Sequence, residues 1–163
     1  MDNIQLQTTI AFSERLRDLL KSHKINRSDF SRSIQRSLPS ISHYINEDIR
    51  PTVDAVILIC EYFGISADYL VLGRENRGLL PLNADTSSFA DRLARAIKYK
   101  GIRKNELARK INRSPQAITR YIQGTSIPAF DVLARIAENL TVSLDYLLMN
   151  RGKGELPPQI KNS

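Results

Sequence analysis

The stretch Lys104–Gly124, KNELARKINRSPQAITRYIQG, decides the fold of this chain. Its apolar residues recur at helical spacing and predict two short helices. Asn112 marks a tight turn between them, since Asn tolerates the left-handed backbone. Ser114 can cap the second helix, and Pro115 suits its first position, where a missing N–H costs nothing. The residues expected to face inward are Leu107, Ala108, Ile111, Ile118 and Ile122.

This stretch belongs to the second copy of a duplicated unit. Shifting the sequence by 77 residues aligns 12–73 with 89–150 without a gap, and 20 of the 62 paired positions are identical. A gapless alignment of this length indicates two copies of one fold. The identities include Phe12/Phe89, Leu16/Leu93, Ile34/Ile111, Ser37/Ser114, Ile41/Ile118, Tyr44/Tyr121, Pro51/Pro128, Ile59/Ile136 and Asp68/Asp145.

Each copy is expected to form five short helices. In the second copy the first helix begins at Phe89 after Ser88, Pro128 opens the fourth, and Ser143 caps the fifth. In the first copy the expected helices are about 12–22, 27–34, 38–45, 52–63 and 66–71. Two short helices joined by a tight turn in such a bundle make a helix-turn-helix. The fold class is therefore all-α, with two tandem five-helix domains.

The domain limits follow from the alignment. Domain 1 covers 12–73, a linker 74–88, domain 2 89–150 and a tail 151–163. The linker's 15 residues reach at most about 50 Å when extended.

Composition narrows the function classes. The net charge of +7 and the pI near 9.8 favour a polyanionic partner. With no apolar run of 18 residues and no basic, apolar leader, we expect a cytoplasmic protein without a membrane partner. The single Cys60 is expected in the core rather than as a redox sensor. His23 and His43 have no neighbours at metal spacing, and no nucleophile–base pair or phosphate loop stands out. We therefore expect no metal, no cofactor and no enzyme.

Copy two carries a family pattern: Glu106-Leu107-Ala108, Ile111, Ser114, Ile118, Tyr121, Gly124, Pro128, Leu133, Ile136-Ala137, Leu140, Val142-Ser143 and Asp145-Tyr146-Leu147-Leu148. It resembles the Cro/phage-repressor (XRE-type) helix-turn-helix family, whose domains are lambda-repressor-like. Copy one departs from the pattern at Gln35 and Glu47. The resemblance implies sequence-specific binding of double-stranded DNA. It usually serves to control transcription, as a repressor, in bacteria, phages or mobile elements.

The resemblance also assigns the base-reading residues to the third helix of each copy. Gln can bond adenine, Arg can bond guanine, and the methyl groups of Ala and Thr can meet thymine. The candidates are Gln116, Ala117, Thr119 and Arg120 in copy two, and Pro39, Ser40, Ser42 and His43 in copy one. The second set offers fewer strong pairings, so looser readout is expected there, and His43 can equally be a plain surface histidine.

Phosphate contacts are expected from residues near the helix ends. The candidates are Arg103, Lys104, Arg113 and Gln123 in copy two, and Arg27, Arg36 and Asn46 in copy one. The pairs Arg103-Lys104 and Arg109-Lys110 have a second interpretation as a solvated face.

The two copies differ in charge. Residues 12–73 carry 8 basic and 8 acidic residues, whereas 89–149 carry 11 and 5, a net charge of +6. Domain 2 is therefore expected to be the main DNA anchor. Glu47 and Asp48, after the third helix of copy one, would repel phosphate. Domain 1 then either reads a second half-site weakly or contacts a protein, by self-association or through an effector protein. Because DNA half-sites lie about 34 Å apart, the linker allows one chain to contact two of them, and a homodimer of chains is equally compatible. The alternative function is a protein-interaction module of the antitoxin or anti-repressor type.

Overall fold

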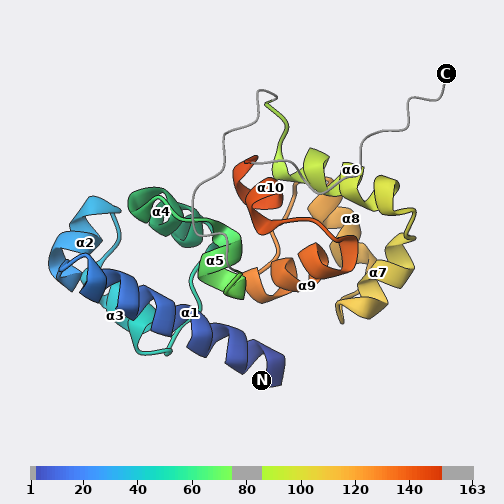
Figure 1. The fold of residues 1–163 in the computed structure, drawn as a ribbon. Coiled ribbons are helices and arrows are strands. Elements are labelled where there is room, and N and C mark those ends of the chain that lie inside the picture. The colour runs from blue at the N-terminus through green and yellow to red at the C-terminus, as the bar shows by residue number, and fades with distance from the viewer. Residues whose placement is uncertain (1–2, 75–85, 152–163) are drawn as a thin grey trace. The chain divides into compact units, whose positions relative to one another are not determined.

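A computed structural model describes residues 3–74 and 86–151, with the backbone alone for residues 3–9. The chain divides into two compact units, Met1–Leu79 and Leu80–Ser163. The described part of each unit holds five α-helices, and no strand occurs in either (Figure 1). The all-α prediction is confirmed. Residues 75–85 of the predicted linker and 152–163 of the predicted tail lie outside the described residues.

Domain 1 is built from helices α1 to α5. Their bounds are α1 Asn3–Ser22, α2 Arg27–Ser33, α3 Leu38–Ile45, α4 Val53–Phe63 and α5 Ala67–Leu72. Helix α1 packs against α3 and α5, α2 against α3, and α4 against α5 (Figure 1). The fully buried core comprises Phe12, Leu16, Phe30, Ile41, Ile59, Cys60 and Leu70. The core position expected for Cys60 is thus confirmed.

Domain 2 repeats this arrangement with helices α6 to α10. Their bounds are α6 Phe89–Lys100, α7 Lys104–Lys110, α8 Pro115–Ile122, α9 Phe130–Leu140 and α10 Leu144–Met149. Helix α8 packs against α6 and α7, and α10 packs against α6 and α9. The core comprises Leu93, Ala96, Leu107, Ile111, Ile118, Leu133, Ile136 and Leu147.

Serine side chains begin several of these helices, as the sequence predicts. Ser114 Oγ accepts a hydrogen bond from Ala117 N–H at 3.2 Å, and Ser143 Oγ accepts one from Tyr146 N–H at 3.0 Å. Such N-caps satisfy backbone donors that have no partner within the helix. They fix where the chain turns from extended to helical.

The two domains also share their left-handed turn residues. Each domain has five residues with φ between 51° and 71°, at equivalent positions. The pairs are Lys24/Gly101, Gln35/Asn112, Glu47/Gly124, Gly64/Thr141 and Gly73/Asn150. Four of the five pairs contain one glycine, and the fifth contains none. The turn geometry therefore belongs to the fold, and domain 1 keeps it at Gln35 and Glu47, where it departs from the family pattern.

Three details differ from the sequence predictions. Helix α1 begins at Asn3 rather than near Phe12, because no Pro or Gly interrupts residues 3–11. Helix α9 begins at Phe130 rather than Pro128, because Ala129 is still extended, with ψ 156°. In α8 Tyr121 is buried beside Ile118, whereas Ile122, which was expected to face inward, is only half-buried.

An arginine joins the first and last helices of each domain. Arg92 on α6 is 5% exposed, and its Nε and Nη2 donate to Leu147 O on α10 at 3.2 and 2.8 Å. Arg15 on α1 donates to Leu70 O at 3.0 Å. Burial lowers the pKa of Arg15 from its ordinary value. The repeat alignment pairs these two arginines, so the identity alone signalled a shared role.

Candidate DNA-binding interface

In domain 2 the interface is built on α7, the turn after it, and α8. Ser114 and Pro115 fix the start of α8, and the left-handed Asn112 sets the turn from α7. Helix α8 buries Ile118 and Tyr121, which anchor it to the core. Its opposite face is consequently left to solvent.

Gln116 and Arg120 lie on this solvent face. They are four residues apart, which places them on the same side of a helix, and both are exposed. No ion pair with Arg120 occurs in the described part of the domain. An exposed amide and an exposed guanidinium on one face can each form two hydrogen bonds to a base edge.

The other two base-reading candidates of α8 are less accessible. Thr119 is half-buried, and its Oγ1 donates to Pro115 O at 3.2 Å. Ala117 is only 6% exposed and packs towards the core. This burial leaves the Ala117 methyl little surface for a thymine contact, so we rank Ala117 below Gln116, Thr119 and Arg120.

The phosphate candidates of domain 2 lie at the start of α7 and at the two ends of α8. Arg103, Lys104 and Gln123 are exposed, whereas Arg113 is half-buried and donates to Asn112 O at 2.9 Å. Arg109 extends this cationic surface, since it lines with Arg103 a shallow pocket of about 310 Å³. The sequence left Arg109 between a solvated face and a DNA contact, and its place beside Arg103 favours the contact.

Domain 1 presents weaker base-reading chemistry on the same framework. Pro39 is exposed but has no donor, and Ser42 is half-buried. Ser40 Oγ lies 2.7 Å from Ser37 Oγ. His43, at the position of Arg120, has its Nδ1 3.2 Å from Asp48 Oδ2. Two of the four candidates are therefore already engaged within the domain.

The acidic residues after α3 are also partnered. Arg17 Nη2 lies 2.7 Å from Glu47 Oε1, and their side chains are 46% and 30% exposed. The Arg17 charge offsets that of Glu47, which weakens the repulsion of phosphate expected from the sequence, and the Asp48 carboxylate contacts the His43 ring. Arg17 was not among the expected site residues, because it lies 30 positions from Glu47.

The phosphate candidates of domain 1 take two different positions. Arg27 and Asn46 are exposed, with Asn46 at the C-terminal end of α3. Arg36 is half-buried and lines a pocket beneath α4. Arg32, the counterpart of Arg109, forms an ion pair with Asp29 instead. The surface flanking α3 therefore offers fewer unpaired cations than that flanking α8.

Residues 3–74 and 86–151 bear on two further kinds of site, a membrane span and a metal site. No helix in those ranges is long and apolar enough to cross a membrane. The same ranges contain no cluster of His, Cys, Asp or Glu that could hold a metal ion.

The arrangement in both domains defines a protein with two tandem helix-turn-helix domains. The chain matches the helix-turn-helix family twice, at residues 16–70 and 93–147, and it belongs to that family, of the Cro/C1 (XRE) type. The family is one of DNA-binding regulators rather than enzymes. Neither the curated proteins nor the solved structures yield a match to this chain.

Proposed function

We propose that this chain is a sequence-specific regulator of transcription that represses an operon of a bacterium, phage or mobile element. The observation that carries the proposal is the exposed pair Gln116 and Arg120 on α8, inside a domain with a net charge of +6. Cations near the helix ends hold the DNA backbone, and the pair reads base edges in the major groove. The protein acts on double-stranded DNA in the cytoplasm.

In this proposal the two domains divide the work. Domain 2 anchors the chain through Arg103, Lys104, Arg113 and Gln123, and reads one half-site. Domain 1 reads a second half-site weakly through α3, with Arg27, Arg36 and Asn46 as its phosphate contacts. The engaged state of Ser40 and His43 supports this ranking. Both domains can lie on one DNA within a single chain or within a homodimer.

A binding experiment with the full chain tests the proposal. Gel shifts on DNA from upstream of its own gene should give a specific complex at moderate salt. Arg120→Ala should weaken specific binding by about 1–3 kcal/mol, because it removes a bidentate base contact. His43→Ala, at the equivalent position of domain 1, should cost less.

The controls separate the candidate functions. Non-specific DNA should bind both variants almost equally, since the lost contacts read bases rather than phosphates. A larger loss from His43→Ala than from Arg120→Ala would reverse the ranking of the domains. Absence of any specific complex would contradict the proposal.

A second candidate function rests on domain 1. Its net charge is 0, and the contacts Arg17–Glu47 and His43–Asp48 combine acidic and basic groups at the end of α3. Such a mixed surface suits a protein partner better than a phosphate backbone, in the manner of an antitoxin or anti-repressor. Under this alternative, domain 2 alone binds DNA, and α3 contacts the partner protein.

A further inference from the structure

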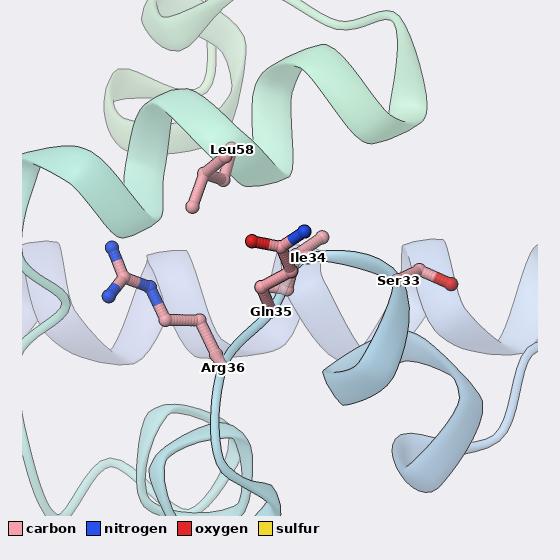
Figure 2. Close-up of a pocket in the computed structure, with 5 residues that line it drawn as sticks. All are labelled: Ser33, Ile34, Gln35, Arg36 and Leu58. Atoms are coloured by element: carbon pink, nitrogen blue, oxygen red, sulfur yellow. The ribbon is translucent and has the colours of Figure 1, made fainter.

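A pocket of about 330 Å³ lies in domain 1 between the helix-turn-helix turn and α4. Gln35 and Arg36 extend from the turn towards α4, and Leu58 extends from α4 towards the turn (Figure 2). Ser33 and Ile34 complete the lining. The volume falls at the lower end of the range of small-molecule sites, about 300–1,000 Å³.

Arg36 supplies the charged group of this pocket. Its Nε is buried and has no hydrogen-bond partner within the described residues. A buried donor on a charged group is costly when it has no acceptor. An acceptor brought by a ligand would therefore gain more from this guanidinium than from a solvated one.

In domain 2 the equivalent space between the turn and the fourth helix is occupied by an arginine side chain. The counterpart of Leu58 is Arg135 on α9, and its Nη1 donates to Ile111 O at 3.3 Å. The counterpart of Arg36 is Arg113, which donates to Asn112 O at 2.9 Å. In domain 2 an arginine thus spans the space between the fourth helix and the turn. In domain 1 the shorter Leu58 leaves that space open.

We propose that this pocket binds a small organic carboxylate. The Nε–H and one Nη–H of a guanidinium lie side by side and match the two oxygens of a carboxylate. Gln35 can add a donor from its side-chain amide. Ile34 and Leu58 form an apolar wall that suits a hydrocarbon body, which an inorganic anion lacks.

Ligand binding would have a consequence for DNA. Arg36 is one of the proposed phosphate contacts of domain 1, so a bound carboxylate would compete with the DNA backbone for it. This consequence rests on the proposed function. The binding itself does not, and it is tested without DNA.

The test is an NMR titration of the isotope-labelled full chain with 3-methylbutanoate in a carboxylate-free buffer. Saturable shifts are expected at the amides of Gln35 and Arg36 and at the Arg36 Nε–H. The dissociation constant should be on the order of 1–10 mM, as suits so small a ligand. The amides of Asn112 and Arg113 should not move.

Matched variants fill the pocket of domain 1 and open the equivalent space in domain 2. Leu58→Arg introduces the residue of domain 2 and should weaken binding about tenfold or more, a readily measured difference. Arg36→Gln removes the guanidinium from a half-exposed position and should abolish the shifts. Arg135→Leu should create new shifts at Asn112 and Arg113. A dispersed spectrum verifies that each variant is folded.

Three outcomes would overturn the proposal. The first is a titration that shows no saturable shift at Gln35 or Arg36. The second is binding that persists unchanged in a folded Arg36→Gln variant. The third is that inorganic phosphate causes shifts equal to those caused by 3-methylbutanoate. The pocket would then be a general anion site to which the apolar wall contributes nothing.

Discussion

Single residues decide how the shared framework of the two domains is used. Arg120 and His43 occupy equivalent positions on α8 and α3. His43 lies 3.2 Å from Asp48, whereas the counterpart of Asp48 in domain 2 is Thr125, whose Oγ1 donates to Arg120 O at 3.2 Å. Thr125 leaves the Arg120 guanidinium without a carboxylate at this position. These two differences separate an engaged side chain in domain 1 from an available one in domain 2.

Residue spacing predicts part of this site and misses the rest. The exposure of Gln116 and Arg120 follows from helical periodicity. The burial of Ala117 was missed, since the family resemblance placed it among the base-reading residues, although its position four residues before Tyr121 puts it on the packed face. The Arg17–Glu47 ion pair joins distant positions, so only the folded chain reveals it.

Replacing Arg92 should lower the free energy of unfolding of domain 2. Arg92→Ala leaves Leu147 O, on α10, without the two donors that reach it in the folded domain. Leaving a buried acceptor unpaired costs about 1–3 kcal/mol. Urea unfolding followed on NMR signals of domain 2 measures the loss. Arg109→Ala, at an exposed position, is the control and should stay within about 0.5 kcal/mol. Equal effects would mean that the α6–α10 hydrogen bonds contribute nothing specific.

At the scale of elements, caps and turns explain which helix limits the sequence predicts. Ser114 and Ser143 carry a hydroxyl oxygen that can accept the N-cap hydrogen bond, so the sequence predicts these helix starts correctly. Ala129, the N-cap of α9, carries none, and the sequence therefore pointed to the nearby Pro128 instead. The start of α1 was equally hidden, because the repeat alignment begins only at Phe12.

The uncapped start of α9 offers a test by exchange between domains. In domain 1 the equivalent residue is Thr52, whose Oγ1 accepts from Ala55 N–H at 3.3 Å. Ala129→Thr should stabilise domain 2 by about 0.5–2 kcal/mol, because it supplies the missing cap. Thr52→Ala should destabilise domain 1 by a similar amount. Urea unfolding of each variant checks both signs. A loss at Thr52 without a gain at Ala129 would show that α9 cannot use a cap.

The start of α6 should respond to pH. Ser88 Oγ and N–H donate to Asp91 Oδ2 at 2.7 and 2.9 Å. These hydrogen bonds lower the pKa of Asp91 below its ordinary 3.8. Because the folded pKa is lowered, the stabilisation is present above pH 3.8 and is lost as the pH falls through the folded value. An NMR titration of the Asp91 carboxyl should give a lower midpoint in the folded chain than in urea.

A variant separates the charge of Asp91 from its hydrogen bonds. Asp91→Asn keeps a neutral acceptor for Ser88, so its unfolding midpoint should vary less between neutral and acid pH. The mid-helix position of Glu14, its counterpart in α1, offers no such cap. If the unchanged protein and the Asp91→Asn variant lost stability equally as the pH fell, Asp91 would not be the titrating group at this helix start.

At the scale of the whole molecule, charge sets the unequal roles proposed for the domains. This asymmetry is predictable from composition alone, since 89–149 carries a net charge of +6 and 12–73 carries 0. Composition does not show that two of the eight acids of domain 1, Glu47 and Asp48, contact Arg17 and His43 at the end of α3. The acidic charge next to α3 can therefore be removed at two adjacent positions.

Replacing those two acids by their domain 2 counterparts tests whether domain 1 touches DNA. Glu47→Gly with Asp48→Thr raises the charge of domain 1 by 2 and releases Arg17 and His43. Stability should change by less than about 1 kcal/mol, because relief of a left-handed non-glycine residue offsets the loss of an exposed ion pair. The salt dependence of DNA binding should steepen by about 0.9 for each phosphate newly contacted.

The control is a second double variant with the same change in charge. Asp54→Asn with Glu61→Gln neutralises two exposed acids of α4 rather than those at the end of α3. If both double variants steepened the salt dependence equally, the effect would come from total charge. If only the first did, α3 of domain 1 would lie on the DNA. An unchanged slope in both would instead favour the protein partner, because freeing Arg17 would then bring no phosphate within reach.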